Sequence, residues 1–303
     1  MKLLEKIEKL KIERNAVILA HNYQPDEVQD LADFTGDSLR LSIKAAETNA
    51  EVIVFCGVHF MAETAAILSP EKTVLLPEKE AGCPMADMIT AEQLRELKSK
   101  HPDALVVCYV NTSAEVKAES DYCCTSANAA EVVDFLPKDK DIIFVPDKYL
   151  GQYVAEKSDQ DFVLWPGYCH VHVVITEDDI NKAKARFPNA IVMAHPECTS
   201  TVKELADRIL STSQMIKFAK ESNAKQFIVA TEKGIIHALT KQNPDAEFIP
   251  ASERAICPNM KKITVEKVLW SLEQMQYKIT LPENIRQKAK RALDRMVETL
   301  PKK

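Results

Sequence analysis

Three cysteines recur at nearly equal spacing along the 303-residue chain. Cys83, Cys169 and Cys257 are 86 and 88 residues apart, and each follows shortly after an apolar run that ends in proline. No pair of cysteines has the C-x-x-C spacing of zinc ribbons or thioredoxin-like sites. Three thiolates can hold a zinc ion with one open position, or an iron–sulfur cluster with one iron left without a protein ligand. The alternative is that the three thiols are small buried hydrophobes.

Six polar residues recur with the same spacing directly after three apolar runs, in two layers: His21, Tyr109 and His195, then Tyr23, Asn111 and Glu197. A single histidine after a strand is usually structural, but two threefold layers of polar groups are difficult to explain as core. Glu197 is the natural general acid or base of this set, and His and Tyr side chains can assist proton transfer.

A third recurring set consists of hydroxyl side chains, Ser38, Ser126 and Thr212, each just before an expected helix. We expect some of them to act as helix N-caps. Free N–H groups at a helix N-terminus also bind phosphate or carboxylate. Three such termini around one cavity would therefore suit anionic substrates.

The elements that must position these residues form an internal repeat. Each unit reads as strand, helix, strand, helix, strand, helix, strand, and its strands are continuous apolar runs rich in Val, Ile and Leu. Such runs are typical of parallel strands that helices cover on both faces. Right-handed crossovers bring the C-terminal ends of these strands to one edge of the sheet, where ligands bind. We therefore predict an α/β fold of three pseudo-threefold-related subdomains, each a short parallel sheet flanked by helices, with the active site at their central junction.

The repeat also suggests limits for the subdomains. We expect the first, with an N-terminal helix, over residues 1–100, the second over 101–187 and the third over 188–263. The sequence from 264 to 303 is expected to form a helical extension that packs on the outside.

Composition excludes several classes of function. The formal net charge of −6 offers no basic footprint for nucleic acid. No apolar run approaches the length of a membrane span, and the charged amphipathic start does not resemble a signal peptide. We therefore expect a cytoplasmic protein.

Several stretches resemble the quinolinate synthase A family of NAD biosynthesis: LAHNYQ, QDLADFTGDSL, YVNTSAEVKAESDYCCTSANA, HPEC, STSQM and CPNMKKIT. The resemblance runs essentially from residue 5 to 300. It implies three α/β subdomains around one [4Fe–4S] cluster per chain, held by Cys83, Cys169 and Cys257 with one open iron site.

By the same resemblance, Glu197, Tyr23, Tyr109 and His195 would be catalytic. The implied substrate-binding residues are His21, Ser38, Tyr109, Val110, Asn111, Ser126, His172, His195, Pro196, Glu197 and Thr212.

The implied reaction condenses iminoaspartate (iminosuccinate) with dihydroxyacetone phosphate to quinolinate, with loss of phosphate and water. The cluster would act as a Lewis acid, and an aspartate oxidase or dehydrogenase would supply the iminoaspartate. Two alternatives stay open at this point: a zinc lyase or hydrolase with three cysteines, and an iron–sulfur redox sensor.

Overall fold

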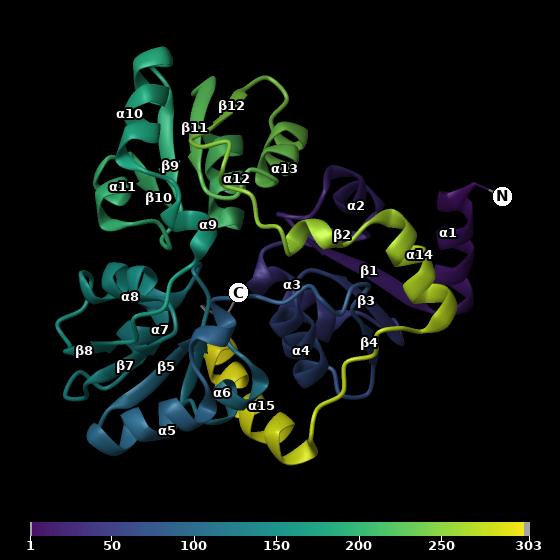
Figure 1. Ribbon diagram of the computed structural model, residues 1–303, viewed down its shortest axis with the longest axis horizontal. Coiled ribbons are helices and arrows are strands. Elements are labelled where there is room, and N and C mark those ends of the chain that lie inside the picture. Colours follow the sequence, from purple (N-terminus) through teal and green to yellow (C-terminus); the bar gives the residue numbers. More distant parts are fainter. Residues whose placement is uncertain (1, 300–303) are drawn as a thin grey trace.

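A computed structural model describes residues 2–299 and contains three α/β subdomains that meet around a common centre (Figure 1). Each subdomain has one four-stranded sheet, and all its strands are parallel. The strand orders are β2-β1-β3-β4, β6-β5-β7-β8 and β10-β9-β11-β12, so the three sheets share one topology. The predicted fold class is confirmed.

The first subdomain contains α1 (Leu3–Glu13), β1 (Ala16–His21), α2 (Asp26–Leu31), β2 (Phe34–Gly36), α3 (Ser38–Glu47), β3 (Val52–Cys56), α4 (His59–Leu68) and β4 (Thr73–Leu75). The second sheet and its helices are α5 (Ala91–Lys100), β5 (Leu105–Tyr109), α6 (Ala114–Ala118), β6 (Tyr122–Cys124), α7 (Ala129–Phe135), β7 (Ile142–Val145), α8 (Lys148–Ala155) and β8 (Phe162–Leu164). After the short helix α9 (His170–Val173), the third comprises α10 (Glu177–Arg186), β9 (Ile191–Ala194), α11 (Ser200–Glu204), β10 (Arg208–Ile209), α12 (Thr212–Glu221), β11 (Gln226–Ala230), α13 (Ile235–Gln242) and β12 (Glu247–Pro250).

Helices α5 and α10 pack with the elements that follow them, against α6 and against α11 and β11 respectively. The subdomain limits expected at residues 100/101 and 187/188 stay a prediction.

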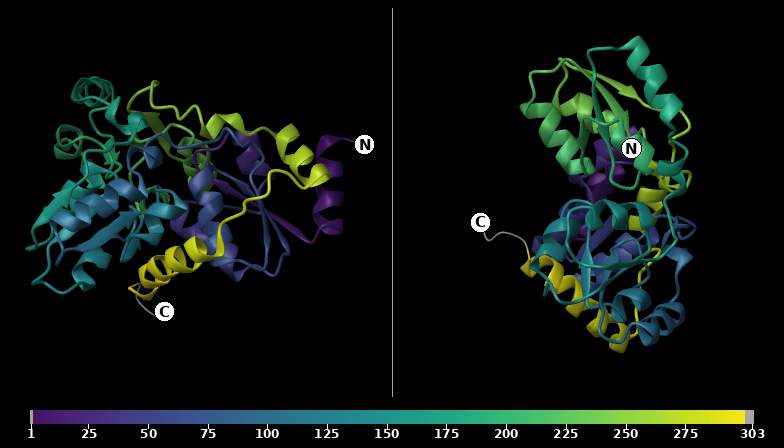
Figure 2. Two further views of the ribbon diagram at one scale, coloured as in Figure 1. Left: turned by 60° about the horizontal axis from the view of Figure 1, so that its bottom comes forward. Right: turned by 90° about the vertical axis from the view of Figure 1, so that its left-hand side faces the viewer.

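The C-terminal extension consists of α14 (Val265–Gln274) and α15 (Glu283–Glu298). Helix α14 packs on α1, while α15 runs along the outside and contacts α6 and β6 of the second subdomain and α4 of the first (Figure 2). The extension therefore braces two subdomains. Residue 1 and residues 300–303 of the predicted segments lie outside the described residues.

In each unit, an equivalent aspartate links the first crossover connection to the central strand by hydrogen bonds. Asp33, Asp121 and Asp207 each accept a hydrogen bond from the backbone N–H of their central strand, at 2.8, 2.9 and 2.8 Å. The backbone N–H of the same aspartate donates back to the carbonyl of the same strand residue. This closed pair of bonds explains why aspartate recurs in the sequence.

The buried apolar residues form one large core that all three subdomains and the tail share, and a smaller core in the third subdomain, to which β9 and β11 contribute their alternate residues. No helix within residues 2–299 combines the length and the apolar character needed to cross a membrane.

Candidate functional site

A central cavity lies where the C-terminal strand edges of the three sheets converge. Its lining includes thirteen of the fifteen predicted site residues: His21, Tyr23, Ser38, Cys83, Tyr109, Asn111, Ser126, Cys169, His172, His195, Glu197, Thr212 and Cys257. Residues from all three subdomains contribute, as expected from the strand-end rule for parallel sheets.

Two predicted substrate-binding residues do not line the central cavity. Val110 and Pro196 are buried in the bend and the turn that follow β5 and β9, one position after Tyr109 and His195. Cys198, one residue after Glu197, is also buried and donates from Sγ to the carbonyl of Ala230 at 3.3 Å.

The expectation that Ser38, Ser126 or Thr212 caps a helix is wrong. The residue before Ser38 is the cap of α3, since Asp37 accepts from the N–H of Arg40 at 2.9 Å. Likewise Ser211 caps α12, and Asn128 precedes α7. Ser38 and Thr212 stand instead at the first helical position of α3 and α12 and line the cavity, and the Thr212 hydroxyl accepts from Asn22 Nδ2 at 3.3 Å.

The two equivalent histidines share one tautomer. His21 Nδ1 accepts from the backbone N–H of Tyr23 at 3.1 Å, and His195 Nδ1 accepts from the backbone N–H of Glu197 at 3.3 Å. Burial lowers the pKa of both imidazoles to about 3. Each ring is therefore neutral, and with Nδ1 as acceptor its proton sits on Nε2, which becomes a hydrogen-bond donor.

Glu197 is the charged centre of the site. Its Oε1 accepts from the hydroxyl of Tyr109 at 2.5 Å, and its Oε2 lies 2.9 Å from His172 Nδ1. The second contact is at ion-pair distance but is not aligned as a hydrogen bond. Burial raises the pKa of Glu197, but its contact with His172 and the bond from Tyr109 outweigh that effect, so the net pKa is low and the group is a carboxylate.

The polar contacts of His172 continue on the other side of its ring. His172 Nε2 lies 2.8 Å from Thr231 Oγ1, and the same hydroxyl lies 2.6 Å from the Tyr23 hydroxyl. Tyr109, Glu197, His172, Thr231 and Tyr23 thus form one continuous polar chain across the cavity. Burial raises the pKa of the Tyr109 and Tyr23 hydroxyls well above the ordinary value, so both are proton donors rather than phenolates.

Thr231 was missed by sequence reasoning, although a signal for it existed. It follows the end of β11, the third strand of its unit, and we applied the strand-end rule to the first strands and the serine and threonine set. The same rule applied to the third strands also finds Asp147 after β7 and Glu232 after β11.

Asp147 and Glu232 support the loops that carry two of the cysteines. Asp147 Oδ2 accepts from the backbone N–H of Cys169 at 3.2 Å, and Glu232 Oε1 accepts from that of Cys257 at 3.1 Å. Both carboxyl groups are buried, and they occupy equivalent places in their units. Val58 takes this place in the first unit, so Cys83 has no such partner.

Each cysteine is also surrounded by backbone donors at the start of a short helical turn. N–H groups of Ala86 and Met260 face the sulfurs of Cys83 and Cys257, and that of His172 faces Cys169. Burial nevertheless raises the pKa of all three thiols, that of Cys83 to about 12. A cation is therefore needed to hold these sulfurs as thiolates.

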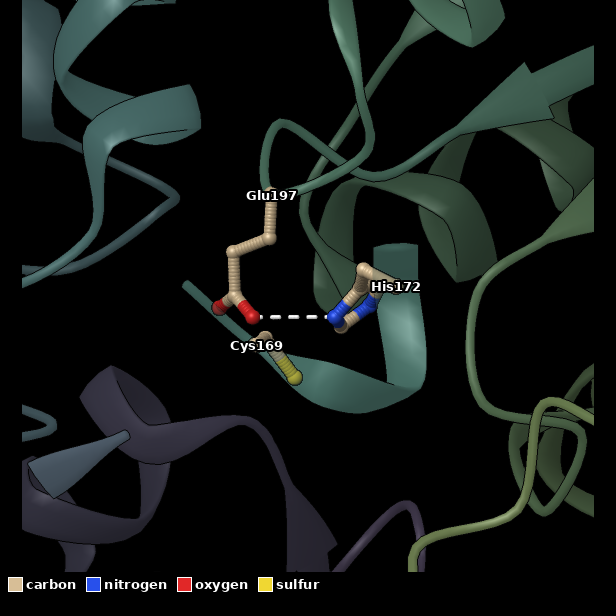
Figure 3. Close-up of side chains that lie close together, drawn as sticks. All are labelled: Cys169, His172 and Glu197. Carbon is tan, nitrogen blue, oxygen red and sulfur yellow. Dashed lines mark ion pairs between the residues drawn. The ribbon is translucent and has the colours of Figure 1, made fainter. Parts of the chain in front are cut away.

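The spacing of the sulfurs distinguishes between metals. Within residues 2–299, the one group of three or more donors whose ligand atoms all lie within 4.8 Å is Cys169, His172 and Glu197 (Figure 3). The sulfurs of the three cysteines do not form such a group, whereas sulfurs on one tetrahedral zinc ion stand about 3.8 Å apart. At least one pair of these sulfurs is therefore more than 4.8 Å apart, so the three do not surround a single-ion site in this arrangement.

Figure 3 shows the Glu197 carboxylate and the His172 ring pointing toward each other, with the Cys169 sulfur beside them. This trio could ligate a single ion. Glu197 Oε1 also accepts from Tyr109 and His172 Nε2 contacts Thr231, while the buried His172 Nδ1 has no hydrogen-bond partner.

Comparison with known proteins shows which family the whole chain resembles. The family model described as "Quinolinate synthetase A protein" matches residues 5–298. A protein named quinolinate synthase from Dehalococcoides mccartyi strain CBDB1 is 58% identical over 295 residues, which cover 97% of each chain. Quinolinate synthase 2 of Methanosarcina acetivorans is 56% identical over 97% of this chain and 94% of its own, and the Geobacter metallireducens protein is 57% identical over 97% and 96%.

Proposed function

The chain belongs to the quinolinate synthetase A family and is an enzyme of NAD biosynthesis, and on this premise we propose that it condenses iminoaspartate with dihydroxyacetone phosphate. The product is quinolinate, and phosphate and water are released. One observation carries the proposal: cysteines from three subdomains line the same cavity as a chain of polar contacts centred on the buried Glu197 carboxylate.

The cavity has groups suited to both anionic substrates. Helices α3 and α12 direct their N-termini and the hydroxyls of Ser38 and Thr212 into it, and such termini bind phosphate or carboxylate. His21 and His195 add two neutral Nε2–H donors, which can bind carboxylate oxygen without changing charge. Asn111 Oδ1 is buried with no hydrogen-bond partner, as expected of a side chain that bonds to substrate.

Glu197 is the proposed general base. Loss of a proton from the carbon next to the imine, with protonation of the imine nitrogen, converts iminoaspartate into an enamine, whose carbon can attack the second substrate. The Glu197 carboxylate accepts that proton, and the Tyr109 hydroxyl, 2.5 Å away, supplies one where oxygen leaves. His172 and Thr231 connect the same carboxylate to Tyr23, so protons can be exchanged between opposite walls of the cavity.

Cys83, Cys169 and Cys257 would hold a [4Fe–4S] cluster. When bound, a cluster with three cysteine ligands supplies a Lewis-acidic iron that assists the loss of hydroxide. The backbone donors around each sulfur would stabilise the thiolate ligands, as surrounding hydrogen bonds do at metal sites generally.

The test is an anaerobic assay for quinolinate with purified protein, paired with iron and sulfide analysis. We expect quinolinate in proportion to the cluster content, and iminoaspartate supplied by an aspartate oxidase or dehydrogenase should serve as substrate. Cluster-loaded protein that makes no quinolinate would refute the proposed reaction. Zinc in place of iron and sulfide would refute the proposed cofactor.

A further inference from the structure

Three buried side chains with donor groups occupy equivalent positions in the repeat. Gln29 on α2, Lys117 on α6 and Lys203 on α11 are 88 and 86 residues apart, the spacing of the repeat itself. Their exposed fractions are 4%, 0% and 5%. Buried lysine is costly unless its ammonium group is hydrogen-bonded, so the partners of these side chains are informative.

Gln29 contacts its own strand-end loop and a neighbouring subdomain. Its Nε2 donates to the carbonyls of Asn22 and Gln24 at 3.1 and 2.8 Å, which flank Tyr23. The same nitrogen donates to the carbonyl of Gly234, in the third subdomain, at 3.0 Å. Three carbonyl acceptors around one atom identify it as the amide nitrogen.

Lys203 makes the equivalent contacts in the third subdomain. Its Nζ donates to the carbonyl of Pro196, next to Glu197, at 3.4 Å and to the carbonyl of Tyr149, in the second subdomain, at 2.7 Å. Tyr149 and Gly234 each lie four residues after the paired end of the third strand in their units.

Lys117 completes the set in the second subdomain. Its Nζ donates to the carbonyl of Thr112, the residue after Asn111. The ammonium group also lies 5.6 Å from the centroid of the Phe60 ring, in the first subdomain. Phe60 occupies the place of Tyr149 and Gly234, four residues after the strand end. Here a cation–π contact replaces the hydrogen bond.

We propose that Gln29, Lys117 and Lys203 are positioning residues that form a closed ring around the central cavity. Each holds its own catalytic loop and joins that loop to the next subdomain: first to third, third to second, and second to first. The second-layer side chains Tyr23, Asn111 and Glu197 sit in these three loops.

The ring sets distances on which the proposed chemistry depends. The bond between Tyr109 and Glu197 crosses from the second to the third subdomain, and Lys203 joins the same two subdomains through Tyr149. The contact between Tyr23 and Thr231 crosses from the first to the third, which Gln29 joins through Gly234. A displacement of about 1 Å between reacting groups can cost on the order of 100-fold in rate.

The test compares Lys203→Met, which keeps the side-chain length but removes the donor, with Lys203→Gln, which keeps a donor of the kind that the first subdomain uses. Lys184→Met is the control. Lys184, on α10, donates to the carbonyl of Leu205 at the end of α11, the helix that carries Lys203, and it contacts no catalytic loop. With equal cluster content, we expect kcat to fall about 10- to 100-fold in Lys203→Met with KM within about twofold. Lys203→Gln should recover part of the loss, and Lys184→Met should match the wild type.

Because this kinetic test rests on the proposed reaction, a second measurement is independent of it. In cluster-loaded protein, Lys203→Met should speed amide hydrogen exchange in peptides that cover residues 195–198 and 147–151, and Lys184→Met should not. A wild type without quinolinate synthesis would refute the function and leave this exchange result standing. Unchanged exchange in Lys203→Met, or a Lys203→Gln variant no better than Lys203→Met, would overturn the ring.

Discussion

The first subdomain and the other two share a sheet topology but support their cysteines differently. In the second and third, a buried carboxylate after the third strand, Asp147 or Glu232, accepts from the N–H of the cysteine. In the first, Val58 stands there, and the loop before Cys83 is held from outside. Lys262 donates to the carbonyl of Glu80 at 2.7 Å.

A contact from the C-terminal extension holds the same loop. Lys267 on α14 pairs with Glu78 at 2.6 Å. The turn that contains Lys262 and the C-terminal extension therefore hold the cysteine loop of the first subdomain, where an internal carboxyl group does so in the other two. The three units therefore place a cysteine at the same position, although different residues support the loop that carries it.

The largest effects should come from replacing the cysteines, and we expect the loss of any one of the three to have the same consequence. Cys83→Ala and Cys169→Ala should each abolish the brown chromophore after anaerobic purification and reduce quinolinate formation at least about 100-fold, because a cluster with two protein ligands is poorly held. Absorption spectra and iron analysis measure the first effect, and the anaerobic assay the second. A Cys169→Ala variant with normal colour and activity would refute the cluster model.

The next prediction compares Glu197 and Tyr23, which occupy equivalent positions but have different proposed roles in proton transfer. Glu197→Gln keeps the volume of the side chain but cannot act as a base, so kcat should fall about 10²- to 10⁴-fold while the iron content is unchanged. Tyr23→Phe, at the equivalent place in the first subdomain, removes only the far end of the proton chain and should cost about tenfold. Full turnover by Glu197→Gln would remove Glu197 from proton transfer.

The carboxylates that support the cysteine loops should have a smaller effect, on metal retention. Glu232→Gln weakens the acceptor for the N–H of Cys257, and partners of this kind typically change metal affinity about 10- to 100-fold. We expect faster loss of iron to a chelator, followed by the decay of the chromophore. Val58→Ala, the matched change in the first subdomain, should retain iron as the wild type does. Equal retention in both variants would show that the carboxylate is not a support.

The smallest effect concerns the external support of the first subdomain. Lys267→Met removes the ion pair with Glu78, whose partners are 39% and 17% exposed. Partly exposed pairs of this kind contribute about 0–1 kcal/mol, so thermal unfolding should shift by a few degrees at most, with iron retained. Loss of the cluster in this variant would show that the tail is as important for Cys83 as Glu232 is for Cys257.

Much of this arrangement could be predicted from the sequence because each unit repeats in the same order. The register of the repeat placed Cys83, Cys169 and Cys257 together although 86 and 88 residues separate them. The helix caps were misassigned by one to two residues at Asp37, Ser211 and Asn128, since several residues able to cap lie side by side and only the backbone angles select one.

Partners that come from different units could not be predicted in this way. Thr231 joins His172 to Tyr23, and Lys203 reaches Tyr149, through contacts that depend on how one subdomain turns against the next. A repeat aligned along the chain places equivalent residues but contains no information on the interfaces between units.

The sequence by itself determined the parallel sheets, the edge at which they present polar side chains, and the family to which the chain belongs, because apolar runs and motifs are local and recur in order. Only the tertiary structure decided that Glu197 is shared by Tyr109 and His172, that the three sulfurs do not all lie within 4.8 Å of one another, and that Gln29, Lys117 and Lys203 contact neighbouring subdomains. These are distances between residues far apart in the chain, and the packing of three subdomains sets them.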